Sequence, residues 1–299
     1  MADADSASEE DTTVEAVFDA VAETAPAIRA ALPGRRVESG AENPSGETAL
    51  AADVYADELL AEALAAVDGV GSYVSEEREA AVDAGGAVDE DAYAVAVDPL
   101  DGSSNLRSNN AMGTVVGVYD APLPTTGRDL VAAGYVLYGP ITTMVVADAD
   151  GVREEVIEGD GEGGVDRSVT EPDLTLPDDP VVYGFGGRVP DWPADFTAYA
   201  REIERELKLR YGGAMVGDVN QVLTYGGVFA YPALVDAPDG KLRLSFEANP
   251  IAYIVERAGG RASDGASPIR DVDPDGLHDR VPLYVGNAEL IERLEAALA

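Results

Sequence analysis

Two aspartates, Asp98 and Asp101, stand three residues apart in the segment Val97–Asn105, which reads VDPLDGSSN. The apolar run Tyr93–Val97 predicts a buried strand, so we expect the aspartates where that strand turns into a loop. Pro99 lies between them, and a turn there allows both carboxylates to point to one place. The motif contains no Lys or Arg, and an oxygen-bound divalent cation relieves the repulsion between converging carboxylates. The pair therefore predicts a metal site.

Small residues with free backbone amides, Gly102, Ser103 and Ser104, follow immediately. If a short helix starts there, its amino end offers N–H groups to an anion beside the metal. A metal ion next to an anion site suits the hydrolysis of a phosphate ester. A plain solvated turn is the alternative, since the same residue types are common in turns. Such a turn does not require aspartates on both sides of Pro99.

A further carboxylate, Asp53, falls on the apolar stripe of a helix predicted from Thr48 to Val67. Leu50 and Val54 are its neighbours at helical spacing. A buried carboxylate is costly unless the protein uses it, so Asp53 is a candidate functional residue. A solvated helix edge is the alternative. Asp57, one turn later, is expected to be exposed.

Adjacent acids, Glu76 and Glu77, end an apolar strand predicted around Tyr73–Ser75. On extended backbone their side chains point in different directions, so one can bind a metal while the other holds a water. A charged strand end is the alternative. The candidate magnesium ligands at this stage are Glu76, Asp98, Asp101 and Glu247.

Cations cluster in the second half of this anionic chain. Gly240–Glu247 is predicted as a strand that carries Lys241, Arg243 and Glu247 on one side. Basic and aromatic residues also stand beside the glycine pair Gly212–Gly213, where a ligand can approach the backbone. Such cations are natural receptors for a phosphorylated sugar. The candidates are Arg210, Tyr211, Tyr231, Lys241 and Arg243.

The remaining elements must position these residues. Helical spacing predicts helices from Thr12 to about Pro33, over 195–207, over 218–223, from Asn249 to Gly259 and from Asn287 to the end. Strands are predicted over 113–119, 181–185 and 228–231, with two more within 130–148. Residues 1–11 are expected to be disordered, 35–46 to be a mobile loop and 159–164 to be a hairpin tip or linker. We place a boundary between two halves, 12–172 and 178–299, near residues 170–180.

Composition narrows the function. The chain has 57 acidic and 20 basic residues in 299, a formal charge of -37, which argues against nucleic acid or an anionic membrane as a partner. The absence of cysteine excludes thiol chemistry, and the single histidine, His278, excludes a multi-histidine zinc site and is expected on a loop or the surface. The acidic start lacks a secretory signal, and glycines interrupt the uncharged stretch 130–147, so we expect a cytoplasmic protein. The acidic composition is similar to that of proteins from salt-loving microbes.

The motif DPLDGSSN resembles the metal-binding signature of the sugar phosphatase superfamily. From residue 12 to 299 the chain is similar to class I fructose-1,6-bisphosphatases. The segments that carry this resemblance are VSEE at Val74–Glu77, DPLDGSSN at Asp98–Asn105, DLVAAGYVLYG at Asp129–Gly139, RYGGAMVGDV at Arg210–Val219, YGGVFAYP at Tyr225–Pro232 and GKLRLSFEANPIAYIVERAGG at Gly240–Gly260.

The resemblance implies a layered αβαβα sandwich and a magnesium-dependent enzyme of gluconeogenesis that removes the 1-phosphate of fructose 1,6-bisphosphate. Two or more Mg²⁺ ions, or Mn²⁺ instead, would be held by Glu76, Glu77, Asp98, Asp101, Glu247 and the Leu100 carbonyl. Asp53 with Glu77 would activate the water. Amides of Gly102, Ser103 and Ser104 would receive the 1-phosphate, and Lys241 and the Met215 backbone the sugar. Tyr211, Tyr231 and an Arg210 from a neighbouring subunit would receive the 6-phosphate, which implies a homotetramer or homodimer.

Departures from the family pattern bear on regulation. The two basic residues that hold the phosphate of AMP in regulated members correspond to Ala92 and Asp120, so we expect weak or absent inhibition by AMP. Glu47 stands where the family has an aspartate. The alternatives for function are a sedoheptulose-1,7-bisphosphatase, a broad sugar or inositol phosphatase, and a non-catalytic sugar-phosphate sensor.

Overall fold

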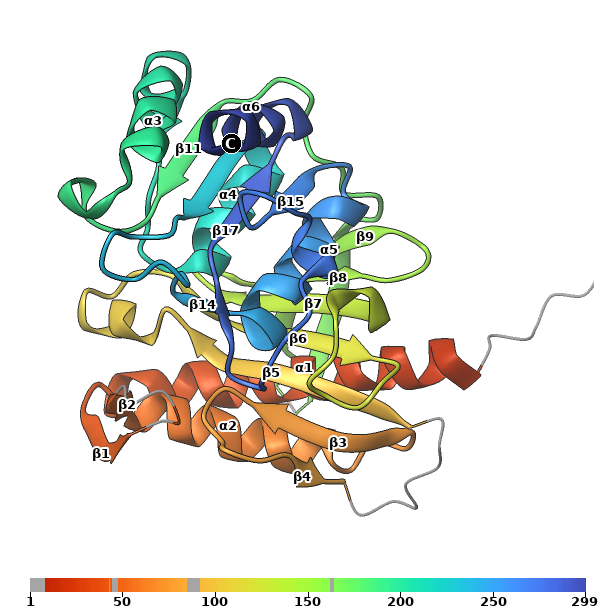
Figure 1. The fold of residues 1–299 in the computed structure, drawn as a ribbon. Coiled ribbons are helices and arrows are strands. Elements are labelled where there is room, and N and C mark those ends of the chain that lie inside the picture. The colour runs from red at the N-terminus through yellow and green to blue at the C-terminus, as the bar shows by residue number, and fades with distance from the viewer. Residues whose placement is uncertain (1–8, 43, 45–47, 85–91, 162–163) are drawn as a thin grey trace, which may run out of the picture.

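The computed structural model describes residues 1–299 except 1–8, 43, 45–47, 85–91 and 162–163. Two sheets and three layers of helices alternate through the molecule (Figure 1). Helices α1 and α2 contact the outer face of the larger sheet, α4 and α5 lie between the two sheets, and α3 and α6 cover the smaller sheet. The layered αβαβα sandwich implied by the sequence is therefore confirmed.

The larger sheet has eight strands in the order β10-β9-β8-β7-β6-β5-β3-β4. Neighbours are antiparallel except β3 and β5, which are parallel. Its strands are β3 (Val70–Ser75), β4 (Val82–Asp83), β5 (Tyr93–Asp101), β6 (Met112–Tyr119), β7 (Leu130–Tyr138), β8 (Thr142–Ala147), β9 (Val152–Gly159) and β10 (Val165–Glu171). Every residue of β5 and β6 is buried, as expected of central strands that are covered by helices on both faces.

The smaller sheet has five strands in the order β12-β11-β13-β17-β15. They are β11 (Val182–Phe185), β12 (Lys208–Leu209), β13 (Gly227–Tyr231), β15 (Arg261–Ser263) and β17 (Leu283–Gly286). Two short pairs complete the strands, β1 (Glu38–Glu42) with β2 (Thr48–Leu50) and β14 (Leu242–Arg243) with β16 (Arg280–Val281). Both sheets pack on the same helix layer, and the division into two halves stays a prediction.

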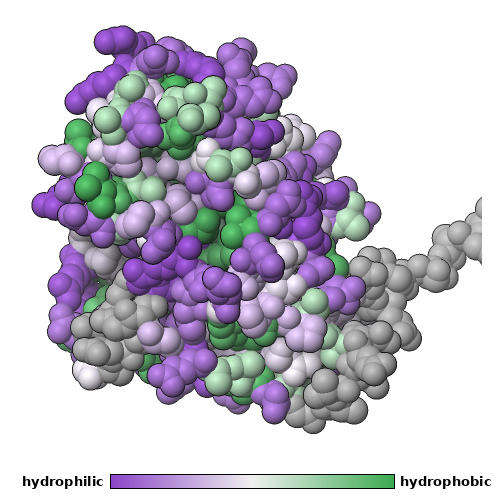
Figure 2. Space-filling view, viewed as in Figure 1, coloured by the Kyte–Doolittle hydropathy of each residue, from purple (hydrophilic) through white to green (hydrophobic). Residues whose placement is uncertain are grey.

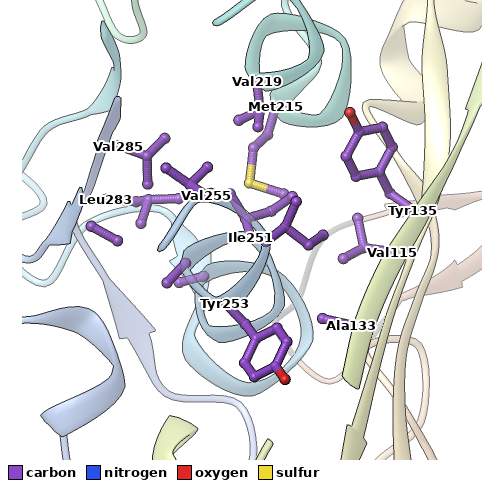
Figure 3. Close-up of a cluster of buried hydrophobic side chains, with 14 of the residues drawn as sticks. Val115, Ala133, Tyr135, Met215, Val219, Ile251, Tyr253, Val255, Leu283 and Val285 are labelled. Carbon is purple, nitrogen blue, oxygen red and sulfur yellow. The ribbon is translucent and has the colours of Figure 1, made fainter. Parts of the chain in front are cut away.

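The helices are α1 (Glu9–Ala31), α2 (Ala51–Leu64), α3 (Ala194–Glu206), α4 (Met215–Tyr225), α5 (Asn249–Arg257) and α6 (Ala288–Leu298). Apolar side chains from both sheets meet those of α4 and α5 in the middle layer (Figure 3). Met215 and Ile251 are completely buried there, with Val115 on one side and Leu283 on the other. Burial of this area is the main force that joins the two sheets.

Near the amino end the sequence was a weaker guide. Helix α1 begins at Glu9, within the segment predicted to be disordered, and residues 1–8 lie outside the described part. The predicted loop 35–46 contains β1, whose partner β2 replaces the first turn of the helix expected from Thr48. Pairing across the 43–47 connection competes with helix propensity here, and a pattern confined to one segment does not report it. The predicted Glu47 departure also falls outside the described residues.

Other local predictions were closer. The hairpin tip predicted over 159–164 does connect β9 to β10. Asn287 precedes α6 as expected, but its side chain does not cap that helix. Its Oδ1 accepts from Gly227 N (2.7 Å) and its Nδ2 donates to the Pro177 carbonyl (2.8 Å). Asn287 therefore joins α6 to the neighbouring strand and to the connection between the sheets.

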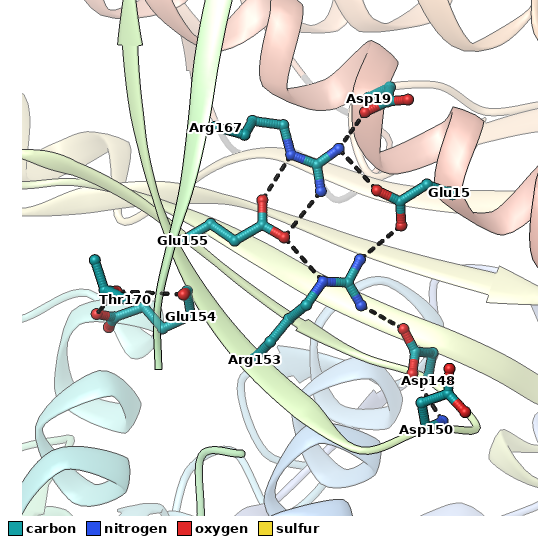
Figure 4. Close-up of polar contacts among 9 residues, drawn as sticks. All are labelled: Glu15, Asp19, Asp148, Asp150, Arg153, Glu154, Glu155, Arg167 and Thr170. Atoms are coloured by element: carbon teal, nitrogen blue, oxygen red, sulfur yellow. Dashed lines mark hydrogen bonds and ion pairs between the residues drawn. The ribbon is translucent and has the colours of Figure 1, made fainter. Parts of the chain in front are cut away.

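Two arginines on the larger sheet, Arg153 and Arg167, hold a network of acids that we call the arginine network (Figure 4). Both guanidinium groups bind the buried Glu155, with Nε–carboxylate distances of 2.8 Å and 2.6 Å. The network continues to Asp148 and, on α1, to Glu15 and Asp19. It therefore fastens α1 to β9 and β10.

On the face shown in Figure 2, hydrophilic residues predominate and apolar ones form small separate groups.

Candidate functional site

A cavity of about 390 Å³ contains most of the predicted chemistry. It opens where the end of β5, the turn after β3, the start of α2 and the segment after β14 meet. Its lining consists of Glu38, Ala49, Leu50, Asp53, Glu76, Glu77, Asp98, Leu100, Asp101, Gly102, Ser103, Ser104, Arg107, Lys241, Arg243 and Glu247.

Three carboxylates, Glu76, Asp98 and Glu247, form the tightest group, with one oxygen of each within 4.8 Å of the others. We call them the carboxylate cluster. Burial, followed by repulsion from Glu76 and other acids, raises the pKa of Asp98 and of Glu247 well above the ordinary value. Converging carboxylate oxygens that repel one another suit a hard divalent cation. The residues therefore fit the divalent metal that the sequence predicts.

Asp101 lies beside the cluster, at the amino end of α4. Its Oδ2 accepts from Val216 N at 2.7 Å, and the Met215 amide is a further donor. Burial raises its pKa to about 6, although these amides and Lys241 oppose the shift. A helix amino end stabilises the charged form of Asp101, which thereby joins the larger sheet to the middle layer.

The backbone departs from the prediction at two ligand positions. Strand β5 does not end before Asp98 but continues to Asp101, with an irregularity in its pairing to β6 between the two aspartates. Such an irregularity re-aims side chains that would otherwise alternate. Glu247 is not on a strand: only Leu242–Arg243 is extended, and a π-helical turn, Leu244–Ala248, presents Glu247. Its carboxylate accepts from Arg243 N at 2.6 Å, and π-turns are frequent at functional sites.

The predicted short helix after the motif is present as a 3-10 helix, Ser103–Arg107, preceded by Gly102. Gly102 has φ +72°, and an added Cβ would lie 2.2 Å from the Cβ of Ala214. Only glycine satisfies both the backbone angle and this contact. The amides of Gly102, Ser103 and Ser104 consequently start the turn at the cavity wall.

Asp53 is buried, as its place on the apolar stripe predicts. It accepts from Leu50 N at 2.6 Å, and burial raises its pKa to about 6 despite that bond and one from Ser103. A carboxylate with such a pKa can accept a proton near neutral pH. Asp57, expected to be exposed, is instead buried and bound by Tyr73 and Arg78, because β3 packs against α2 there.

The two cations of the cavity differ. Lys241 is exposed, and its Nζ lies 5.1 Å from the ring centre of Tyr231. Arg243 is only 1% exposed, with Nη2 3.6 Å from Glu76 Oε1. Its Nε and Nη2 have no hydrogen-bond acceptor among the described residues. Buried donors of this kind call for an acceptor, and an anionic ligand in the cavity provides one.

Four predicted residues do not line the cavity. Tyr211 and Tyr231 lie together with hydroxyls 3.1 Å apart, next to Lys241. Met215 is completely buried, so only its backbone is available. Arg210 is exposed, near Gln221 and over the ring of Tyr225.

Two residues of the site were missed by the sequence reasoning. Asp218 accepts from Gly212 N (2.6 Å) and Gly213 N (3.2 Å), and burial raises its pKa to about 6. Asn105 donates from Nδ2 to the carbonyls of Ala111 (2.8 Å) and Gly212 (2.9 Å). Both hold the Gly212–Gly213 loop against the 3-10 helix. Asn105 is the last residue of the DPLDGSSN motif, and this position in the motif could have indicated that it belongs to the site.

No helix among the described residues is long and apolar enough to cross a membrane.

Comparisons with known proteins agree with this geometry. Models of the N-terminal and C-terminal domains of fructose-1,6-bisphosphatase match residues 9–162 and 176–299. The class 1 fructose-1,6-bisphosphatase of Natronomonas pharaonis is 61% identical over 95% of this chain and 98% of its own length. That of Halobacterium salinarum is 57% identical over 95% and 97%.

Among solved structures, Leishmania major fructose-1,6-bisphosphatase in holo form superposes with a TM-score of 0.87 at 29% identity, covering 96% of this chain and 94% of that one. The T-state of the same protein gives a TM-score of 0.81. Domain matches over nearly the whole length and relatives more than 50% identical lead to one conclusion: the chain belongs to the class 1 fructose-1,6-bisphosphatase family.

Proposed function

We propose that this protein hydrolyses the 1-phosphate of fructose 1,6-bisphosphate, giving fructose 6-phosphate and phosphate, as a Mg²⁺-dependent step of gluconeogenesis. The observation that carries the proposal is the carboxylate cluster beside the buried Arg243, whose Nε and Nη2 have no hydrogen-bond acceptor within the described structure. Family membership supports the substrate class.

Glu76, Asp98, Asp101, Glu247 and the Leu100 carbonyl would hold two or more Mg²⁺ ions, or Mn²⁺ in their place. Bound divalent ions would lower the pKa of the attacking water and neutralise charge on the leaving oxygen. The ligands are all oxygen atoms, the donor type that Mg²⁺ prefers.

Asp53 is the proposed general base, aided by Glu77. With a pKa of about 6, its carboxylate is largely ionised at neutral pH yet basic enough to take a proton from water. The bond from Leu50 N fixes one of its oxygens. Water attacks phosphorus, the bond between phosphorus and the oxygen on the first sugar carbon breaks, and that oxygen leaves with the sugar.

The amides of Gly102, Ser103 and Ser104 would receive the 1-phosphate, with Arg243 beside them. Lys241 and the Met215 backbone would contact the sugar, and the Tyr211–Tyr231 hydroxyl pair the 6-phosphate. Arg210 projects from the surface outside the cavity, which supports its donation to the 6-phosphate site of a neighbouring subunit. We therefore propose a homotetramer or a homodimer. Size-exclusion chromatography with light scattering at high salt measures the molar mass and tests this directly.

The decisive experiment is phosphate release from fructose 1,6-bisphosphate at high KCl, with and without Mg²⁺. Sedoheptulose 1,7-bisphosphate and inositol 1-phosphate are the comparison substrates. Mg²⁺-dependent release that favours the fructose ester is expected. Equal turnover of all three would make the protein a broad phosphatase, and no turnover of any would favour a sugar-phosphate sensor.

Inhibition by AMP is expected to be weak or absent because Ala92 and Asp120 provide no cation for its phosphate. Titration of AMP into the same assay tests this expectation. Potent inhibition that is not competitive with substrate would contradict it.

A further inference from the structure

His278 occupies a more specific place than the loop or surface position expected of it. Its ring is half-buried, and its Nε2 lies 2.9 Å from the carbonyl oxygen of Arg78. Because a carbonyl only accepts, Nε2 carries the proton and donates. Nδ1 is buried without a partner among the residues described. The ring centre lies 5.4 Å from that of Phe246.

The loop that carries His278 also holds the π-helical turn. Leu244 N donates to the Asp279 carbonyl at 2.8 Å, at the start of that turn. The Asp279 side chain in turn accepts from Asp275 N (2.6 Å) and Gly276 N (3.0 Å), which rigidifies the loop. His278 is thus anchored next to the turn that presents Glu247.

Arg78, on the other side of the His278 bond, follows Glu76 and Glu77 directly. Its Nε donates to Asp57 Oδ2 at 2.7 Å, and Tyr73 donates to Asp57 Oδ1 at 2.9 Å. Asp57 is one helical turn after Asp53 on α2. Arg78 therefore joins the turn after β3 to α2 through its side chain. Its carbonyl joins the same turn to the loop of His278, and that loop in turn bonds the start of the π-helical turn.

We propose that His278 is a positioning residue that fixes the Glu76–Glu77 turn against the π-helical turn carrying Glu247, and so sets the spacing of the carboxylate cluster. The inference rests on the proposed function in assigning that cluster to metal binding. Its geometric basis is that Glu76 and Glu247 come from chain segments that the His278–Arg78 bond joins. Residues that orient metal ligands commonly change metal affinity by 10-fold to 100-fold when they are replaced.

The test compares His278→Leu with His278→Gln, whose amide nitrogen can take the place of Nε2, and with Arg261→Met. The last variant removes the remote Arg261–Glu295 pair (2.8 Å) and is the stability control. For each metal-free protein in high KCl, hydrogen–deuterium exchange is measured at the Glu76 and Leu244 amides. Calorimetric titration with Mg²⁺ alone gives metal affinity.

His278→Leu is expected to speed exchange at both amides and to weaken Mg²⁺ binding about tenfold or more, whereas His278→Gln restores most of the affinity. Arg261→Met should change neither. Mg²⁺ binding within about twofold of wild type in His278→Leu, or an equal loss in Arg261→Met, would overturn the proposal. If His278→Leu does not fold, His278→Asn, which is too short to reach Arg78, replaces it with the same expected loss. Neither readout depends on substrate turnover, so failure of the proposed function would be seen separately.

Discussion

Two groups of acids in this protein are built from the same residue types and behave in opposite ways. In the arginine network, Glu155 is buried but bonded to Arg153 and Arg167, and those bonds hold its pKa below the ordinary value although burial opposes them. In the carboxylate cluster, Asp98 is just as buried, yet burial and the neighbouring acids raise its pKa. The difference lies in the compensating charge, not in the acids.

This contrast separates structural from functional acids. The arginine network is complete within the chain and fastens α1 to the sheet. The carboxylate cluster has less compensation: of the cations that line its cavity, Arg243 lies 3.6 Å from Glu76, Lys241 is exposed and Arg107 is paired with Glu38. Repulsion among such buried acids costs stability, and a bound cation would offset that cost.

The largest expected effect comes from Asp98→Asn. Phosphate release should fall by roughly 10³-fold or more, because a central metal ligand is lost. The metal-free variant should nevertheless unfold at the same temperature as wild type or higher, since one repelling charge is removed. Activity assays and thermal unfolding in EDTA at high KCl measure the two quantities. A clearly lower unfolding temperature would show that Asp98 is structural, like Glu155.

The converse change is Glu155→Gln. It should lower the free energy of unfolding by about 2 kcal/mol, because the three charge-assisted bonds from Arg153 and Arg167 lose their ionic partner. Turnover per folded molecule should stay unchanged. Urea unfolding at constant KCl measures the loss, with Arg201→Met as the matched control, whose exposed pair with Glu204 should contribute less than about 1 kcal/mol. Equal losses in both variants would show that Glu155 contributes no more to stability than an exposed ion pair does.

A smaller effect is expected from pH. The pKa of Asp53 and of Asp101 is about 6 in the folded protein, above the ordinary 3.8. The folded state therefore binds more protons than the unfolded state between these values, and this contribution to stability is lost as pH rises from about 4 through 6. The contribution of Glu155 to stability depends on pH in the opposite direction: because its pKa is lowered, that contribution disappears as pH falls.

Calorimetry of the metal-free protein from pH 5 to 8, with and without Mg²⁺, follows the contribution of Asp53 and Asp101, because the lowered pKa of Glu155 lies below this range. The increase in unfolding temperature that Mg²⁺ produces should grow with pH as the carboxylates ionise. An increase that is independent of pH would mean that the cavity acids are already ionised at pH 5.

The sequence predicted the acids of the site better than the backbone that presents them. Asp53, Glu76 and Asp98 were selected because buried or paired carboxylates are costly without a use, and Glu247 because it shares one side of a predicted strand with Lys241 and Arg243. The π-helical turn at Glu247 and the extension of β5 to Asp101 were missed, since both depend on contacts with other segments. The layered architecture followed from family resemblance over the whole chain.

The predicted exposure of Asp57 was wrong for a related reason. Helical spacing placed it correctly one turn after Asp53, but Tyr73 and Arg78 reach it from another element. The His278–Arg78 bond joins residues 200 positions apart, which no local pattern reveals. Long-range partners of this kind are the part of the site that a single sequence did not provide.

The bond from Val216 N to Asp101 has a consequence for synthesis, because it joins residues 115 positions apart. On the ribosome, Glu76, Asp98 and Asp101 emerge long before α4, and Glu247 emerges later still. The nascent chain therefore gathers acids without the amides and the final ligand that complete their arrangement. The complete arrangement of the carboxylate cluster therefore exists only in the finished chain.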